Sequence, residues 1–329
     1  MDGDKVALRP SASLGTGASA SLGTAASASL GTSCQEFYGL RWRRRARGLL
    51  GYLPLFWFIG AAATAQSPAT ATRSALTCTQ MEEFLRTAKI GTRHDLSVGV
   101  TIPSRATLDD GTMQHDASIQ YIDESKPRFQ TLHGTELNFR DSWKFNVAGY
   151  ELAKLLELNM VPPYVERTVA GKPASVSWWV NDAMMERDRF KKKLEPPDVE
   201  TWNDEMYAVR IFHQLIYDTD PNFTNILITK DWRVWMIDFS RAFRLMKNLQ
   251  NPKDLVRCDR RLLAKLRSLT LDMLQQKMGR WVTKSEMEAV IARRDLIVKF
   301  FEAEVAKKGE NMVLYDLPRT GEPCGMGLQ

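Results

Sequence analysis

The sequence predicts an α+β protein of two lobes, a strand-rich half with one main helix followed by a helical half that contains one hairpin. Three observations predict this order. Alternating apolar runs bounded by turn residues fill residues 96–123 and 164–180. Apolar residues at helical spacing dominate after residue 181. One strand pair, at residues 225–239, interrupts those helices.

Residues 1–40 are predicted to be a low-complexity, disordered extension. Residues 11–33 repeat the small-residue string SASLGT, which offers almost nothing to bury. The basic and apolar segment that follows is typical of a signal peptide, which normally begins a chain. One hypothesis is therefore that translation starts near residue 40, so that the extension is untranslated.

Residues 41–65 are predicted to be a signal peptide or a membrane anchor. A basic stretch, RWRRRARG, precedes an apolar run of 15 residues at 49–63 and an Ala-x-Ala site at Ala63 to Ala65. The run is shorter than the roughly 20 residues that a membrane-spanning helix needs, which favours cleavage and export, periplasmic or secreted. The alternative is an uncleaved anchor through residues 49–65.

Composition excludes several classes of protein. With 44% hydrophobic and 26% charged residues, the chain is neither fibrous nor wholly disordered. The formal charge of +6 falls to +2 without residues 1–65, which leaves 38 basic and 36 acidic residues, so no nucleic-acid partner is expected. The four cysteines form no metal-binding pattern, and the three outside residues 1–65 allow one disulfide and one free thiol.

The first lobe is predicted to extend over residues 81–180, after a linker rich in Ala, Ser and Thr at residues 66–80. An Asp-Gly pair, Asp110 and Gly111, is a strong signal for a hairpin turn. The main helix ends before Pro162, because proline disfavours helical geometry in the residue before it. The predicted elements, in order, are a short helix at 81–89, strands at 96–103, 105–108 and 115–123, a helix at 141–158, and strands at 164–169 and 174–180.

The second lobe is predicted over residues 181–317, with a tail at 318–329. The interrupting hairpin consists of a strand that begins at Asn225 and a strand that ends at Phe239. The last helix begins with Thr-Lys-Ser-Glu at Thr283, which matches a capping box. Helices are expected at 201–217, 253–277 and 284–308.

Three polar residues flank this hairpin in the string DTDPNFTNILITKDWRVWMIDFSRAF, residues 218–243. Asp220 lies five residues before Asn225 and eighteen before Asp238. Phosphoryl transfer requires one carboxylate near the attacking hydroxyl and an oxygen-rich pair that holds Mg²⁺ against nucleotide phosphates. Because Asn225 and Asp238 lie at the two ends of paired strands, they are expected to come together.

The motif resembles the catalytic and metal-binding loops of the protein-kinase superfamily, in which Asp-x-x-x-x-Asn is followed by Asp-Phe-small. Its Asp-Pro-Asn and Ile-Asp-Phe segments are closer to the atypical kinase-like superfamily: phosphoinositide 3/4-kinases, secretory-pathway casein kinases and uncharacterised bacterial kinase-like proteins. The resemblance implies a two-lobed protein-kinase-like fold, with the catalytic base at Asp220 and metal ligands at Asn225 and Asp238. The order of elements extends it from about residue 96 to residue 301.

The first lobe departs from the family pattern at the phosphate-binding lysine and its glutamate partner. The resemblance places Gln120 at the lysine position and Asn146 at the glutamate position, with Glu151 a little over one helical turn away. The two amides are expected to hydrogen-bond, but they bring no positive charge to the phosphates. The sequence also lacks a G-x-G-x-x-G loop. Lys126 and Lys144 are candidate substitutes, although each is more typical of a solvated surface.

Each motif residue taken alone has a simpler structural interpretation. Asp238 could cap a helix beginning at Ser240, with Arg241 and Arg244 as structural helix residues. The alternating acids could also form a calcium loop of the EF-hand type, but Phe223 stands where that loop requires glycine. The combination of all three motif residues at matching spacings favours the kinase-like interpretation.

The expected function is metal- and nucleotide-dependent phosphoryl transfer to an unknown acceptor by an exported kinase-like protein. The resemblance implies ATP or another nucleotide, and Mg²⁺ or Mn²⁺, as cofactors, with residues 177–181 as the lobe connection that meets the base. The alternative is a catalytically inactive pseudokinase that binds a nucleotide or a protein, which the missing lysine and glutamate favour. The expected partners are a nucleotide and a protein or small-molecule acceptor, with membrane contact only through an uncleaved anchor.

Overall fold

The computed structural model describes residues 76–95, 103–131 and 134–318. The predicted extension, the signal peptide or anchor, most of the linker, nearly all of the strand at 96–103 and nearly all of the tail lie outside these ranges. Within the described part of the chain, no helix is long and apolar enough to cross a membrane. Cys258 is a buried free thiol, whereas Cys78 is disulfide-bonded.

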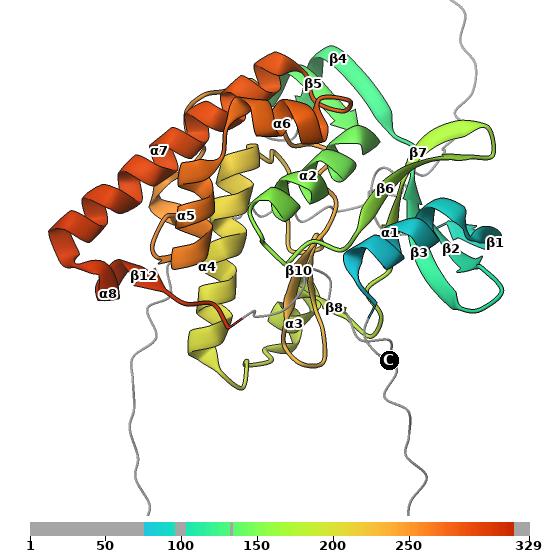
Figure 1. Ribbon diagram of the computed structural model, residues 1–329, viewed down its shortest axis with the longest axis horizontal. Coiled ribbons are helices and arrows are strands. Elements are labelled where there is room, and N and C mark those ends of the chain that lie inside the picture. The colour runs from blue at the N-terminus through green and yellow to red at the C-terminus, as the bar shows by residue number, and fades with distance from the viewer. Residues whose placement is uncertain (1–75, 96–102, 132–133, 319–329) are drawn as a thin grey trace, which may run out of the picture.

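The first lobe is built on an antiparallel sheet of five strands in the order β1-β2-β3-β7-β6 (Figure 1). Helices α1 (Cys78–Thr87) and α2 (Trp143–Leu155) both pack against β6 and β7. The predicted Asp-Gly turn is confirmed between β2 and β3, where Gly111 has a φ of 88°. The strands are β1 (Lys89–Asp95), β2 (Ser104–Asp109), β3 (Gln114–Gln120), β6 (Tyr164–Val169) and β7 (Lys172–Trp178).

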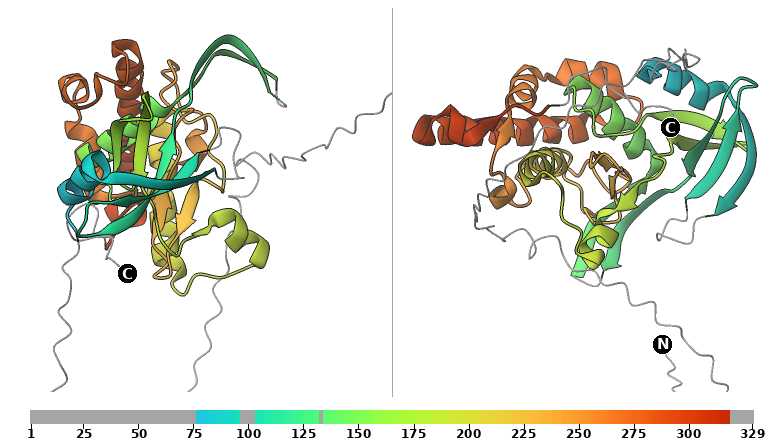
Figure 2. Two further views of the ribbon diagram at one scale, coloured as in Figure 1. Left: turned by 90° about the vertical axis from the view of Figure 1, so that its right-hand side faces the viewer. Right: turned by 90° about the horizontal axis from the view of Figure 1, so that it is seen from below.

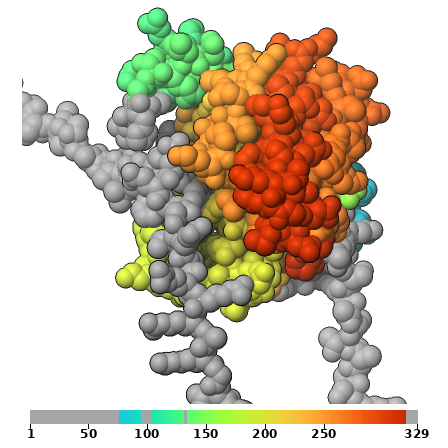
Figure 3. All heavy atoms as spheres, turned by 90° about the vertical axis from the view of Figure 1, so that its left-hand side faces the viewer, coloured from blue at the N-terminus to red at the C-terminus, as the bar shows by residue number. Residues whose placement is uncertain are grey.

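A separate hairpin, β4 (Asp123–Thr131) and β5 (Gly134–Ser142), lies between β3 and α2 in the sequence. Its two strands form their own sheet and do not hydrogen-bond to the five-stranded one. The hairpin arches away from the body in Figure 2 and stands out above the surface in Figure 3. The sequence pattern did not predict it, because its charged residues fall on both faces and Pro127 weakens the signal for a strand.

The second lobe is mostly helical and contains the predicted hairpin. A small sheet of order β10-β9-β8 crosses it, with β8 (Met184–Met185), β9 (Ile226–Ile228) and β10 (Val234–Met236). Two further strands, β11 (Cys258–Asp259) and β12 (Leu314–Tyr315), pair in parallel. The helices are α3 (Glu186–Lys192), α4 (Val199–Ile216), α5 (Arg260–Ser268), α6 (Leu271–Met278), α7 (Lys284–Lys308) and α8 (Glu310–Val313), with a 3₁₀ turn at Pro252–Asp254.

Helix α7 has the predicted limits and the predicted capping box, in which Thr283 and Glu286 bond to each other's backbone N–H. The prediction of one helix over 253–277 is wrong, because that stretch contains the 3₁₀ turn, β11, α5 and α6. The break has a local cause. The hydroxyl of Thr270 accepts a hydrogen bond from the backbone N of Met273 at 3.2 Å and so begins a new helix.

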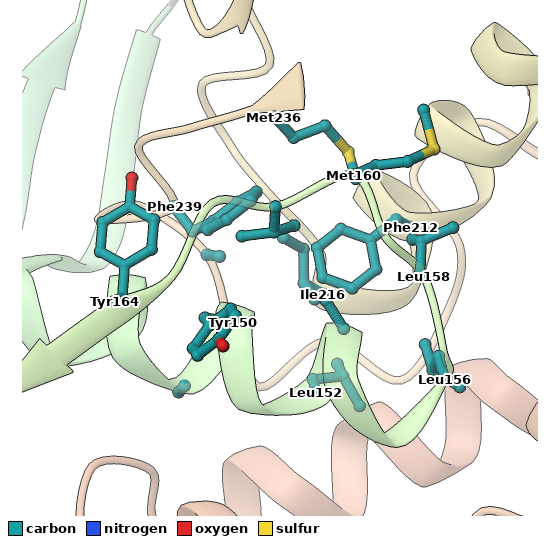
Figure 4. Close-up of a cluster of buried hydrophobic side chains, with 14 of the residues drawn as sticks. Tyr150, Leu152, Leu156, Leu158, Met160, Tyr164, Phe212, Ile216, Met236 and Phe239 are labelled. Atoms are coloured by element: carbon teal, nitrogen blue, oxygen red, sulfur yellow. The ribbon is translucent and has the colours of Figure 1, made fainter. Parts of the chain in front are cut away.

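The core of the protein runs from α1 and the sheet through α2 to the second lobe. Phe239, immediately after the predicted metal ligand Asp238, belongs to this core and is fully buried. Its ring packs edge-to-face on Phe212 of α4 with centroids 5.6 Å apart (Figure 4). The segment that carries Asp238 is thus anchored by an aromatic side chain in the core.

Candidate active site

A cavity of about 420 Å³ lies where the two lobes meet, and its size is that of a small-molecule site. Strands β2, β3, β6 and β7 supply one wall, and the connection after β7 and the β9–β10 hairpin supply the other. The lining residues are Pro103, Arg105, Ser118, Gln120, Tyr164, Ser175, Ser177, Trp178, Trp179, Val180, Asn181, Asp182, Ala183, Met185, Thr224, Asn225, Leu227, Ile237 and Asp238.

The register of the β9–β10 hairpin explains why Asn225 and Asp238 reach the same cavity. Ile226 pairs with Met236, and the backbone N of Ile237 donates to the carbonyl oxygen of Asn225 at 2.9 Å. Asn225 immediately precedes Ile226 and Asp238 follows Met236 by two residues, so the two predicted metal ligands lie beside the same backbone pair. Both side chains line the cavity, as their positions in the sequence predict.

Asp220 lies outside the lining of the cavity, on the loop that connects α4 to β9, and half of its side chain is exposed. The loop is fixed by its own polar groups. The backbone N of Asn222 donates to the Asp220 carbonyl at 2.9 Å, and Nδ2 of Asn225 donates to the same carbonyl at 3.4 Å. The predicted base and the predicted metal ligand Asn225 are thus held by one short segment.

Asp238 has an unusual backbone and a perturbed carboxyl group. Its φ of 58° lies in the left-handed region, which aspartate tolerates better than most residues. Burial raises its pKa, and the negative charge of Asp220 adds to the effect. Its Oδ1 accepts hydrogen bonds from Nε2 of Gln120 and from the backbone N of Ser240, both at 3.4 Å.

The predicted amide pair is present. Nδ2 of Asn146 donates to Oε1 of Gln120, as predicted. The backbone N of Phe239 donates to Oδ1 of Asn146 at 2.6 Å, which assigns the orientation of both amides, because the Asn146 oxygen must face that N–H. Gln120 therefore turns its NH₂ group toward Asp238. We call this closed set of contacts among Gln120, Asn146, Phe239 and Asp238 the amide ring.

The remaining candidates for phosphate contacts lie elsewhere. Glu151 pairs with Lys154 at 2.8 Å and does not line the cavity. Lys126 pairs with Glu124 on the β4–β5 hairpin, and Lys144 pairs with Asp123 at 2.7 Å. Among the described residues that line the cavity, Arg105 is the one arginine or lysine.

Arg105 is itself engaged in contacts. Its Nε donates to Asp116 at 2.7 Å, and its guanidinium lies 4.3 Å from the centroid of the Trp179 ring. The backbone N of Trp179 donates to the Asp116 carbonyl, and its carbonyl oxygen lies 2.9 Å from Nε2 of His115. The backbone N–H and carbonyl of Trp179 are thus already engaged within the first lobe, and the next residues of the lobe connection, Val180 and Asn181, also line the cavity.

Asp141 is an acidic residue that the sequence did not single out. It is the second-last residue of β5, just before the chain enters α2, and it is buried with no hydrogen-bond partner at Oδ1 among the described residues. Burial raises its pKa, and the charges of Asp238 and Asp220 add to the effect. The next residue, Ser142, donates its backbone N to the carbonyl of Ser240 at 2.8 Å, which holds Asp141 close to the Asp238 segment.

The segment after Asp238 is not a helix, so Arg241 and Arg244 are not helix residues as one interpretation predicted. Both guanidiniums instead reach Glu136 on β5. Nη2 of Arg241 lies 2.6 Å from Oε2 of Glu136, and Nη2 of Arg244 lies 2.7 Å from Oε1. Nη1 of Arg241 also lies 3.8 Å from a carboxylate oxygen of Asp220.

A buried histidine and aspartate lie behind the Asp220 loop. Nδ1 of His213 on α4 is 3.4 Å from Oδ2 of Asp218, and both side chains are buried. Burial lowers the pKa of His213 to about 4 and raises that of Asp218 to about 7, which favours a neutral imidazole beside a protonated carboxyl. Oδ1 of Asp218 accepts a hydrogen bond from the backbone N of Asp220 at 3.0 Å.

The residues present fit a metal ion that is shared with nucleotide phosphates. Among the described residues, no three His, Cys, Asp or Glu side chains form a metal site. A Mg²⁺ ion bound mainly by phosphates and water needs only one or two protein oxygens, and Asn225 and Asp238 supply an amide and a carboxylate oxygen. Burial raises the pKa of Asp238, and a divalent cation beside the carboxyl group would favour its ionised form.

Comparison with solved structures confirms the predicted fold. Hydra Fam20, in a structure with sugar, is similar with a TM-score of 0.55 and 13% sequence identity over 73% of this chain and 92% of the hydra chain. The Golgi casein kinase is similar with a TM-score of 0.53 and 12% identity over 74% of this chain and 80% of that one. A structure of that kinase with Mn/ADP bound has a TM-score of 0.51 at 13% identity, over the same shares of the two chains. No family model and no curated protein matches the chain.

Proposed function

On the premise of this atypical kinase-like fold, we propose that the protein is an exported phosphotransferase that uses a nucleotide and a divalent metal ion. The observation that carries the proposal is that Asn225, before β9, and Asp238, after β10, line the same cavity, beside a loop that fixes Asp220. The Mn/ADP bound to the structurally similar Golgi casein kinase supports the same ligand class here. The predicted signal peptide and the disulfide at Cys78 support an oxidising, extracytoplasmic compartment.

Each residue has a distinct task in the proposed site. Asn225 and Asp238 would hold the metal ion, whose charge would neutralise the phosphates. Asp220, outside the cavity and half exposed, would accept the proton of the acceptor hydroxyl. The amide ring would keep the Asp238 carboxylate aimed at the cavity.

A thermal-shift panel of nucleotides with Mg²⁺ or Mn²⁺ tests the proposal, because a ligand that binds only the folded protein raises its Tm. We expect a metal-dependent rise that Asp238→Asn abolishes with little loss of stability. The matched control is Asp231→Asn, which removes an exposed carboxylate from the same hairpin. Equal stabilisation of the wild type and Asp238→Asn by metal and nucleotide would show that Asp238 is not a metal ligand.

Asp220→Asn separates binding from transfer. We expect the metal-dependent rise in Tm to remain, while nucleotide turnover falls by roughly 10² to 10⁴, the usual contribution of a general base. Turnover is measured as release of the nucleoside diphosphate, with water as the acceptor. A variant that keeps wild-type turnover would contradict the role of Asp220.

The second candidate function is a nucleotide-binding pseudokinase. The uncharged Gln120–Asn146 pair favours it, because an amide cannot replace the charge of a lysine at the phosphates. Arg105, already bound to Asp116, does not compensate. A metal-dependent rise in Tm without any turnover in the wild type would establish this function in place of the first.

A further inference from the structure

Glu136 on β5 is held between two arginines of the segment that follows Asp238. Each carboxylate oxygen of Glu136 faces a different guanidinium, at 2.6 Å for Arg241 and 2.7 Å for Arg244. The ring of Phe139 lies below both cations, with centroid distances of 5.1 Å and 5.9 Å. We call Glu136, Arg241 and Arg244 the arginine clamp.

The donors and acceptors of the clamp are poorly matched: Oε1 of Glu136 lies within ion-pair distance of Arg244 but accepts no hydrogen bond from the described residues. The side chain of Arg244 is only 5% exposed, and its Nε and Nη1 have no hydrogen-bond partner in the part of the chain that the structure describes. Nε of Arg241 is also buried without a partner. Buried donors that lack acceptors destabilise a protein, and Glu136 as it is placed leaves these three guanidinium nitrogens without one. The two guanidiniums are therefore suited to an anion with more oxygens.

The position of the clamp connects it with the proposed transfer site. Arg241 approaches Asp220 to 3.8 Å, so an anion bound by the two arginines would lie beside the predicted base. The hydroxyl of Thr219, the residue before Asp220, accepts a hydrogen bond from Nη2 of Arg244 at 3.2 Å. Among the described residues, the lining of the cavity includes no lysine that could bind an anion beside Asp220.

We propose that Arg241 and Arg244 form a phosphate-binding subsite beside Asp220, which Glu136 occupies in the ligand-free protein. A phosphate group presents three oxygens, and paired guanidiniums bind such oxyanions with short, charge-assisted hydrogen bonds. The inference rests on the proposed function. In that function the two arginines would bring positive charge to a phosphate group, which the uncharged Gln120 and Asn146 cannot do.

The attachment of Glu136 makes its displacement feasible. It lies on the β4–β5 hairpin, which shares no backbone hydrogen bonds with the five-stranded sheet and arches away from the body (Figure 2). Glu136 can therefore leave the arginines without disrupting that sheet. A second ion pair, between Arg140 on β5 and Glu286 on α7, keeps the base of the hairpin attached.

Titration of inorganic phosphate into the full chain by calorimetry, without nucleotide, tests the subsite. Glu136→Gln removes the competing charge, so we expect phosphate to bind about tenfold more tightly than to the wild type. The matched control is Glu166→Gln, which breaks an ion pair with Arg280 far from the clamp and should leave phosphate affinity unchanged. Adding Arg241→Gln to Glu136→Gln should abolish the gain.

Arg241→Gln alone provides a second test if Glu136→Gln fails to fold, because it leaves Arg244 paired with Glu136. It should lose measurable phosphate binding while keeping the wild-type Tm within a few degrees. Phosphate affinity that neither variant changes would overturn the subsite.

Two sources of phosphate can be distinguished with a non-hydrolysable ATP analogue at saturation. Competition with inorganic phosphate identifies the terminal phosphoryl group as the ligand, and simultaneous binding identifies a phosphate of the acceptor; either outcome supports the subsite. Failure of the proposed function would appear separately, as a nucleotide response that Asp238→Asn does not change.

Discussion

Asp218 connects the buried interior to the predicted base. It accepts a hydrogen bond from the backbone N of Asp220 on one oxygen and faces His213 with the other. A protonated Asp218 facing a neutral imidazole leaves both buried groups uncharged, which avoids the cost of a charge in the interior. Ionisation of Asp218 would place a negative charge in the interior directly behind Asp220.

Asp218→Asn should therefore change how stability depends on pH. The pKa of Asp218, about 7, lies above its usual 3.8, so its stabilising contribution is complete below the usual pKa and is lost as the pH rises through about 7. Asparagine does not titrate and can keep the bond from Asp220. We expect the Tm of the variant minus that of the wild type to rise by roughly 3 °C or more between about pH 5 and about pH 8.

The measurement is thermal unfolding at a series of pH values. The lowered pKa of His213 has the opposite effect, a loss of stability as the pH falls from 6.5 through about 4, and the histidine is present in both proteins. Asp231→Asn, at an exposed position, should give a flat difference. A flat difference for Asp218→Asn would mean that the buried carboxyl is ionised throughout.

At the scale of residues, the sequence identified the candidate site residues that a motif with fixed spacing along the chain brings together. Asp220, Asn225 and Asp238 belong to one string, and the resemblance places Gln120 and Asn146 by element order. Glu136 and Asp141 could not be predicted in this way. Their proximity to Asp220 and Asp238 arises from an inserted hairpin, and no local pattern encodes where such a hairpin packs.

At the scale of elements, the amide ring joins β3, α2 and the segment after β10. A replacement must therefore satisfy three elements at once. The double variant Gln120→Lys with Asn146→Glu keeps an acceptor for the backbone N of Phe239 and creates an ion pair. It also places a lysine beside the Asp238 carboxylate, to which Nε2 of Gln120 donates at 3.4 Å in the native protein.

For an active enzyme built around the amides, we expect this double variant to lose turnover by at least about tenfold, because the new ammonium competes with the metal ion for Asp238. Nucleotide turnover and affinity are measured together. Gln120→Lys alone is the control, and its lysine lacks a partner and must be desolvated. Higher nucleotide affinity with no turnover in either protein would favour the pseudokinase.

The contact between α2 and the Asp238 segment provides a test of packing. A Cβ atom at Gly149 would lie 2.6 Å from Cδ2 of Phe239, closer than any real contact. We expect Gly149→Ala to lower the free energy of unfolding by about 1 to 3 kcal/mol despite the better helix propensity of alanine. Nucleotide affinity should fall as well, because Phe239 moves Asp238 with it.

Urea denaturation measures the stability change, and a second substitution identifies its cause. The smaller side chain of Phe239→Leu makes room for the methyl group, so Gly149→Ala should cost less in that background than in the wild type. If Gly149→Ala stabilises the protein in both backgrounds, α2 does not press on Phe239, and the link between helix packing and Asp238 fails.

At the scale of the whole molecule, the order of elements predicted two lobes and the motif at residues 218–243 implied the kinase-like fold, which the similarity to Fam20 and the Golgi casein kinase confirms. Helix α7 was predicted with its limits, because its capping box marks the start. The break within residues 253–277 was not predicted, because a threonine within an apolar pattern can either continue a helix or cap the next one. The β4–β5 hairpin was missed because it buries little and so leaves little apolar alternation.

The neutral amides between β3 and α2 have a consequence for the surroundings in which the protein can work. An ion pair at this buried place would be lost when either partner changed its protonation state. Gln120 and Asn146 carry no charge and do not titrate, so the bond between them has no ion pair for salt to screen and neither partner gains or loses a proton as the pH changes. For a chain with a predicted export signal, the contact between β3 and α2 in the first lobe therefore does not require its two partners to stay charged when the pH of the surroundings changes.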